Sequence, residues 1–218
     1  MDEITPAELG QLLRKPIGKH GISVGEGMNI SNVGMYDLIL SKMRLKDDFR
    51  ILEIGLGNGK FVYKYFEKNA RVHVSAIDYS ELMCKIAGDE NQDLMKSGIL
   101  DIRCEDMKAM SFEDNTFDEL VTINTVYFWD PAECCIGEIK RVLKLGGRLY
   151  LGYRTREDMK DLAFAKDVFT LYDSEELESL FLSNGLTIIS QFEYETSRLS
   201  VTGERVTTTD RCLIVEKP

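Results

Sequence analysis

A short apolar run that stops at three alternating glycines constrains this chain more than any other feature. Residues 51–54 are apolar apart from one acid, and glycines follow at positions 55, 57 and 59. The run predicts a buried parallel strand, and the residues from Gly59 onward predict the first turn of a helix. Glycines let the backbone turn sharply and let a ligand lie against it, and a helix N-terminus offers unpaired N–H groups. The pattern therefore predicts a nucleotide-type site.

The spacing of these glycines separates the candidate sites. A dinucleotide fingerprint, G-x-G-x-x-G, would need its third glycine at position 60, which is Lys60. A Walker loop would need Ser or Thr after that lysine, and the chain has Phe61. The remaining pattern, E-x-G-x-G-x-G from Glu53, closely resembles the first motif of class I S-adenosylmethionine (SAM) dependent methyltransferases. A glycine-rich strand-to-helix turn that binds no ligand is the structural alternative.

The resemblance implies that the glycine turn passes under the methionine part of SAM and that the strand acid orders its ammonium end. The residues it assigns to the cofactor here are Glu53, Gly55, Leu56, Gly57, Asn58 and Gly59. Asp78 lies 19 residues beyond Gly59, at the predicted end of the second strand, where an acid can accept both ribose hydroxyls. Tyr79 follows it in the cofactor set, and Ser80 is placed to cap the next helix. The alternative role for Asp78 is that of a helix-cap acid.

An acidic run at residues 105–118 resembles the family's D-A-x-x-L-P-F-x-D-x-x-F-D segment almost position by position. There the leading acid, here Asp106, accepts a hydrogen bond from the adenine amino group, and the next residue, here Met107, bonds the ring through its backbone. Met107 and Ser111 replace a usual small residue and a usual proline, so the shape of the adenine pocket is expected to differ. Glu105 and Asn124 complete the predicted cofactor set. A plain acidic surface loop is the alternative.

Residues 124–129 follow the predicted fourth strand, next to the switch point at which doubly wound sheets bind ligands. Aromatic side chains there could shape an acceptor pocket or stabilise a sulfonium by cation–π contact. The candidate acceptor-binding residues are Met28, Asn29, Tyr127, Trp129, Tyr153 and Arg154. No catalytic residue stands out, and the candidates for a general base, needed only if the acceptor holds its proton, are Tyr127, His20 and Tyr36.

The resemblance implies an α/β fold: a doubly wound, mostly parallel, seven-stranded sheet in the order 3-2-1-4-5-7-6, with the last strand antiparallel. Strands are expected near residues 186–194 and 206–215, with Gly203 at the turn between them. Residues 1–46 are expected to form an N-terminal helical lid segment and residues 47–218 the SAM-binding domain. Within the first segment, helices are predicted from Pro6 to about residue 15 and over residues 33–43. The glycine-rich residues 16–34 are interpreted as a mobile lid or a disordered leader.

The composition limits the kinds of partner that the chain is expected to bind. The chain has 218 residues, a formal net charge of −10 and a pI of about 4.8, which disfavours a nucleic-acid partner. No apolar run approaches membrane-spanning length, and the N-terminus lacks the plan of a signal peptide. Five cysteines without CxxC spacing make a disulfide framework or a metal site improbable. We expect a soluble, cytoplasmic protein with one small-molecule acceptor, no bound metal and no membrane partner.

The expected function is SAM-dependent methyl transfer to a small or medium-sized organic acceptor, by in-line displacement, with S-adenosylhomocysteine as the other product. The alternative from another class is a non-catalytic SAM-binding regulatory or partner subunit. A third possibility, an NAD enzyme, predicts nicotinamide binding and little affinity for SAM. The sequence names neither the acceptor nor the oligomeric state.

Overall fold

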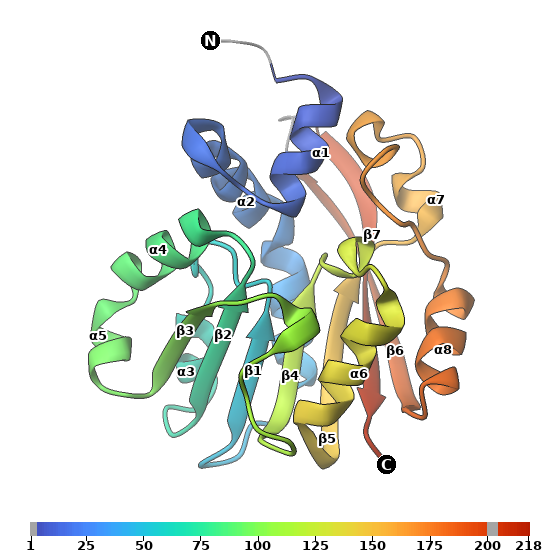
Figure 1. Ribbon diagram of the computed structural model, residues 1–218. Helices are drawn as coiled ribbons and strands as arrows, with labels where there is room; N and C mark the ends of the chain where they lie inside the picture. Colours follow the sequence, from blue (N-terminus) through green and yellow to red (C-terminus); the bar gives the residue numbers. More distant parts are fainter. Residues whose placement is uncertain (1–3, 200–204) are drawn as a thin grey trace.

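Seven strands form one twisted sheet with helices on both faces (Figure 1). The computed structural model describes residues 4–199 and 205–218. The sheet order is β3-β2-β1-β4-β5-β7-β6, in which β1 to β5 run parallel and β7 runs antiparallel between β5 and β6. The predicted fold class and strand order are confirmed. The strands are β1 (Arg50–Ile54), β2 (His73–Asp78), β3 (Leu100–Cys104), β4 (Phe117–Ile123), β5 (Leu143–Tyr153), β6 (Thr187–Leu199) and β7 (Arg205–Glu216).

Two hydrophobic clusters hold the helices to the sheet. One contains Ile136 and Ile139 of α6 and Phe181 of α8, and the other contains Met35 and Ile39 of α2. The central strands are buried on both faces, as expected for parallel strands between two helical layers. The helices are α1 (Pro6–Arg14), α2 (Gly18–Lys42), α3 (Tyr63–Lys68), α4 (Glu81–Glu90), α5 (Gln92–Lys96), α6 (Ala132–Val142), α7 (Arg156–Met159) and α8 (Ser174–Ser183), with short 3₁₀ turns η1 (Met107–Ala109), η2 (Val126–Phe128) and η3 (Ala163–Ala165).

Helix α2 begins at Gly18, so most of residues 16–34 are helical and do not form a disordered leader, and the prediction of a second helix starting near residue 33 was wrong. The glycines in this stretch allow close packing. A Cβ on Gly21 would lie 2.8 Å from the backbone of Pro16, and one on Gly25 would lie 3.2 Å from the sulfur of Met83 in α4. These glycines let α2 approach its neighbours, and that gain outweighs their poor helix propensity.

The predicted helix α1 is confirmed, with a capping box in which Thr5 and Glu8 satisfy each other's backbone N–H groups. It ends at Arg14, before Pro16. Its Gly10 packs against η3, because an added Cβ would lie 2.4 Å from the carbonyl oxygen of Phe164. The first helix of the chain is thereby brought to a segment more than 150 positions later.

Two other boundaries differ from the sequence predictions. The helix after the glycine turn begins at Tyr63 and not at Gly59, because residues 59–62 form tighter turns first. The final strands β6 and β7 are longer than expected, and the predicted turn glycine, Gly203, lies outside the described residues.

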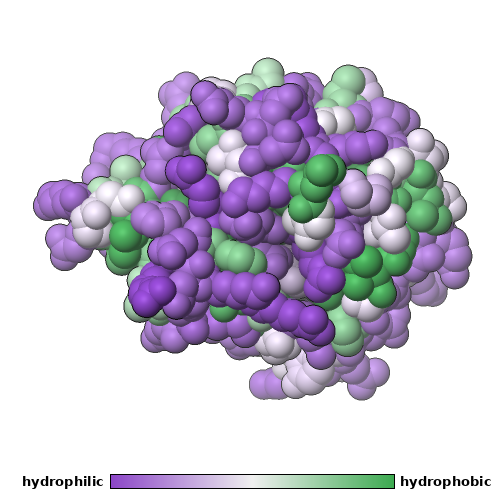
Figure 2. All heavy atoms as spheres, turned by 90° about the horizontal axis from the view of Figure 1, so that it is seen from below, coloured by the Kyte–Doolittle hydropathy of each residue, from purple (hydrophilic) through white to green (hydrophobic). Residues whose placement is uncertain are grey.

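The end of the sheet opposite the carboxyl ends of the parallel strands is shown in Figure 2. Hydrophilic residues cover most of that face, and hydrophobic residues form smaller groups among them. Within the described part of the chain, no helix combines the length and the apolar character needed to cross a bilayer.

Candidate active site

The glycine turn after β1 is shaped for close approach. Gly55, Gly57 and Gly59 all have positive φ angles, of 80°, 60° and 73°, a region that side-chain-bearing residues rarely adopt. A Cβ on Gly55 would lie 2.4 Å from Thr125 Cγ2, whereas one on Gly57 would meet nothing within 4 Å. Gly55 therefore lets the turn pack against the end of β4, and Gly57 leaves an open space above the backbone.

Asp78, the last residue of β2, fixes this turn from the side. Its carboxylate accepts the backbone N–H of Gly57 at 2.8 Å and that of Ser80 at 2.8 Å. Burial raises the pKa of Asp78 to about 6, although these hydrogen bonds favour the charged form and lower it. Ser80 caps α4 by accepting the N–H of Met83, as the sequence predicts. The acid therefore stands at the strand end, next to the turn.

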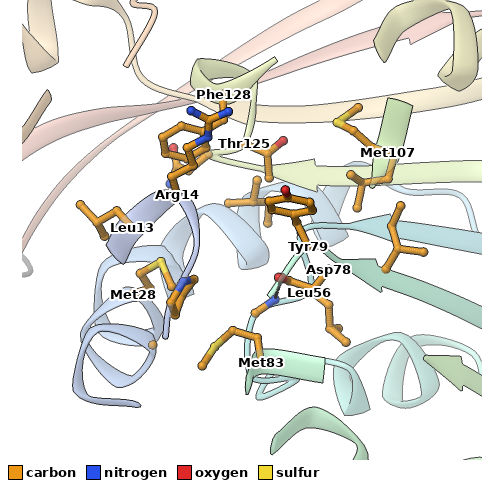
Figure 3. A pocket seen from close by; sticks show the side chains of 18 of the residues that line it. Leu13, Arg14, Met28, Leu56, Asp78, Tyr79, Met83, Met107, Thr125 and Phe128 are labelled. Atoms are coloured by element: carbon orange, nitrogen blue, oxygen red, sulfur yellow. Dashed lines mark hydrogen bonds between the residues drawn. The ribbon is translucent and has the colours of Figure 1, made fainter. Parts of the chain in front are cut away.

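A cavity opens above the turn at the carboxyl ends of the parallel strands (Figure 3). It brings together ten of the twelve predicted cofactor residues: Gly55, Leu56, Gly57, Asn58, Asp78, Tyr79, Glu105, Asp106, Met107 and Asn124. Gly59 does not line it, because its position is packed against Ala87 and Asn91. Asp106 accepts the N–H of Lys108 and so starts the 3₁₀ turn that holds Met107 at the rim.

The first two helices close the other side of this cavity. In Figure 3, Leu13, Arg14 and Met28 face Leu56 and Asp78 across it. Of the acceptor candidates, Met28, Asn29 and Trp129 line this cavity, as does Tyr36. The sequence analysis missed several of its residues, notably Leu13, Arg14, Pro16, Gly25, Asn32, Phe61, Met83, Lys108, Thr125 and Phe128. No local motif marks those in α1 and α2, since packing alone brings these helices to the site.

Glu53, the acid of the glycine motif, lies beneath the cavity and does not line it. It is 1% exposed, and the Tyr36 hydroxyl donates a hydrogen bond to its Oε1. Its Oε2 has no well-formed hydrogen bond, although the Tyr65 hydroxyl lies close by. Burial raises the pKa of Glu53 to about 7, against the lowering effect of the two phenols. Glu53 thus supports a cavity wall through Tyr36.

We expect Glu53→Gln to flatten the pH dependence of stability. The folded pKa of Glu53, about 7, lies above its usual value of 4.5, so the stability it contributes is complete below pH 4.5 and is lost as the pH rises through 7. The glutamine cannot ionise, and it should reduce the loss between pH 5 and 8 by on the order of 2 kcal/mol. Urea unfolding across this pH range measures the change. A profile as steep as that of the unmodified chain would contradict this assignment.

A second cavity adjoins the first and is larger, about 530 Å³ against about 200 Å³. It lies between α1, α2 and residues 158–169, and it reaches Thr207 and Thr208 of β7. The two cavities share five lining residues: Leu13, Met28, Asn32, Asn124 and Phe128. At this common wall the Asn124 side-chain amide donates to Asn32 Oδ1 at 2.9 Å.

The remaining predicted residues fall into two groups. Tyr127 and Arg154 line the second cavity, where the Tyr127 hydroxyl accepts the Arg154 N–H at 2.7 Å. Tyr153 and His20 line neither cavity. Tyr153 is buried, with its hydroxyl against Ser174 and Gln191, and His20 is exposed on α2.

Comparison with known proteins points to the same part of the chain. Residues 52–151, which run from β1 to β5 and hold the glycine turn, Asp78 and Asp106, match the family model of a methyltransferase domain. The chain carries a class I SAM-dependent methyltransferase domain. Its cofactor is SAM.

Two relatives are similar to this methyltransferase domain in sequence. A putative methyltransferase of Bacillus subtilis, YrhH, is 27% identical over 127 residues, which are 58% of this chain and 69% of the relative. A phosphatidylethanolamine N-methyltransferase of Cereibacter sphaeroides is 26% identical over 125 residues, which are 57% of this chain and 60% of the relative. The chain therefore spans about two thirds or less of the length of these two proteins.

Solved structures share the fold of the methyltransferase domain over a longer stretch. The [4+2]-cyclase SpnF superposes with a TM-score of 0.71 at 17% identity, over 98% of this chain and 97% of that one. A SAM-dependent methyltransferase of Methanosarcina mazei superposes with a TM-score of 0.63 at 21% identity, over 79% of this chain and 94% of that one. At these identities the likeness shows the fold alone.

The residues of the first cavity fit SAM. The open space above Gly57 admits a ligand against the backbone, and Asp78, Glu105 and Asp106 supply carboxylate acceptors for hydroxyl and amino groups. Aromatic rings at Tyr79 and Phe128 offer flat apolar surfaces in the same cavity.

Proposed function

We propose that the chain transfers the methyl group of SAM to a small or medium-sized organic acceptor that occupies the second cavity. The observation that carries this proposal is the common wall of the two cavities at Asn32, Asn124 and Phe128. A cofactor in one cavity and an acceptor in the other would meet there. Positioning two reactants in this way accounts for much of the rate that such enzymes achieve.

SAM supplies an electrophilic methyl group on a sulfonium centre. The residues of this chain have to hold the cofactor, align the acceptor and exclude water. Asp78, Glu105 and Asp106 would hold the adenosyl part, and Tyr36, fixed by Glu53, would support the wall beneath it. Helices α1 and α2 would cover both ligands, which is the lid role expected for residues 1–46.

Calorimetry with SAM, followed by assay of S-adenosylhomocysteine over a panel of acceptors, tests the proposal. We expect SAM binding and turnover of at least one acceptor. Binding without product over a broad panel would favour the non-catalytic SAM-binding subunit. Preference for a nicotinamide nucleotide over SAM would overturn both.

Filling the second cavity should separate acceptor binding from cofactor binding. We expect Ala163→Trp to raise the KM for an acceptor about tenfold or more, because its indole would occupy space that the acceptor needs. The dissociation constant for SAM should stay within about twofold, since Ala163 does not line the first cavity. Ala70→Trp, on an exposed turn between α3 and β2, is the matched control. Equal effects of the two variants on KM would place the acceptor elsewhere.

A further inference from the structure

Apolar and aromatic side chains form most of the second cavity wall. The rings of Tyr127 and Phe169 stack with centroids 5.4 Å apart, and the ring of Phe128 meets Phe169 edge-on at 4.7 Å. Around them lie Ile4, Pro6, Leu9, Leu13, Met28, Met159, Leu162, Ala163 and Phe164. Such a wall favours a ligand whose body is apolar, because burying apolar surface is the main driving force available there.

Arg154 is the basic residue among the described residues that line this cavity, and an acid of the chain already engages it. Its guanidinium lies 2.7 Å from Asp210, and Asp158, which also lines the cavity, pairs with Arg211 behind it. A carboxylate or phosphate on the acceptor would therefore find no cation without a partner among the described lining residues of the second cavity. In residues 4–199 and 205–218, Asp161 at the cavity forms no ion pair and is exposed. The local charge thus disfavours anions and favours a group that can carry positive charge.

The wall shared by the two cavities offers no general base. Its five residues, Leu13, Met28, Asn32, Asn124 and Phe128, do not titrate. The nearest phenol, Tyr127, accepts the Arg154 N–H and points its own proton at Arg154 O and Asn124 Oδ1. Burial raises the pKa of Tyr127 well above its ordinary value, so it stays protonated at neutral pH.

A second buried phenol faces the other way. Tyr36 lines only the first cavity, and its hydroxyl donates to Glu53 beneath the turn. The proton of this pair is therefore directed toward β1 and away from the second cavity. None of the five residues of the common wall can remove the proton of an alcohol placed there, whereas a neutral amine already has a lone pair.

Taking the proposed function as given, we infer that the acceptor is an apolar amine, methylated on nitrogen. The amine nitrogen sits at the Asn32–Asn124 pair and its apolar body fills the second cavity. The bound ammonium first loses its proton to water, so that the amine reacts as the neutral base. Its lone pair then forms the new N–C bond as the bond from the methyl carbon to sulfur breaks, and that electron pair stays on sulfur. The methylated ammonium product loses its extra proton to water, so no side chain has to take a proton.

Matched sets of acceptors test this inference with the full chain and SAM. Each set keeps one apolar body and varies the head group, as in 2-phenylethylamine, 2-phenylethanol and 3-phenylpropanoate, with naphthyl and octyl series beside it. We expect kcat/KM for the amine to exceed that for the alcohol by about 100-fold, the factor that general-base help would have to supply. The carboxylates should give no product.

A charge variant at the cavity adds a second readout. We expect Asp161→Asn to raise the KM for amines about two- to fivefold, because an exposed charge contributes only a small attraction. The KM for the uncharged alcohols of the same sets should not change. Asp167→Asn removes an exposed acid that lines neither cavity and serves as the control.

The outcomes separate this inference from the proposed function. Faster turnover of alcohols or of carboxylates, or SAM binding without turnover of any amine in the three series, overturns the amine assignment. Failure to bind SAM at all overturns the proposed function instead. Equal KM changes in the Asp161 and Asp167 variants would show that the charge of Asp161 does not contribute to amine binding.

Discussion

Replacing Asp78 by alanine should weaken SAM binding by about 1–3 kcal/mol, through loss of charge-assisted hydrogen bonds. The structure adds a second reason for a large effect. The same carboxylate accepts the N–H groups of Gly57 and Ser80, so the variant also loosens the glycine turn. Calorimetric titration with SAM at pH 7.5 measures the change, and an unchanged dissociation constant would show that the ribose assignment is wrong.

Lowering the pH should also weaken SAM binding, but less than the Asp78→Ala substitution does. Because the pKa of Asp78 is about 6, protons compete with ligand hydroxyls for its oxygens, and affinity for SAM should fall as the pH drops through 6. Asp78→Asn keeps the size of the side chain but cannot ionise, so its weaker affinity should vary less with pH. Titrations of both proteins at pH 7.5 and pH 5.5 make the comparison. Parallel pH profiles would assign the dependence to another group.

Breaking the buried ion pair between Arg154 and Asp210 should cost about 3–5 kcal/mol of unfolding free energy. Asp210 is 0% exposed, and its carboxylate lies 2.7 Å from the guanidinium of Arg154 without a well-aligned hydrogen bond. Arg154 also donates to the carbonyl oxygen of Ser31 in α2 at 3.0 Å. Asp210→Asn would leave a buried cation without its counter-charge, and urea unfolding at pH 7.5 measures the loss.

Two further variants test whether the missing counter-charge causes this effect. The double variant Arg154→Met with Asp210→Leu removes both charges and should recover most of the lost stability, since apolar replacements of buried pairs are often neutral. Asp89→Asn breaks the exposed pair with Lys85, 2.7 Å apart on α4, and should cost about 0.5 kcal/mol or less. A double variant as unstable as Asp210→Asn would point to lost packing instead.

The cofactor side of the site was predictable because its residues lie in short local patterns. Glycines at 55, 57 and 59 after a strand allow the positive φ angles of a tight turn, and the structure has them. Asp78 is the last residue of one strand and Asp106 follows the end of the next, and parallel strands bring such ends to one edge of the sheet. Glu53 shows the limit of this reasoning, because its motif did not reveal that Tyr36 separates it from the cavity.

The acceptor side depends on contacts between distant parts of the chain. The glycines of residues 16–34 suggested a flexible segment, yet Gly21 and Gly25 serve the close packing of α2 on Pro16 and Met83. Likewise, Gly10 lets α1 approach Phe164, which closes the second cavity between segments more than 150 positions apart in the sequence. Single-sequence periodicity carries no information about such pairs.

The sequence by itself determined the sheet, its strand order through the family resemblance, and the residues beside the glycine turn. Backbone conformation and strand ends are local properties, and local properties can be read from a single chain. Only the tertiary structure decided how α1 and α2 pack over the carboxyl edge and that an apolar cavity meets the cofactor cavity at Asn32 and Asn124. The physical reason is that side-chain packing between remote helices, and not propensity along the chain, fixes where those helices lie.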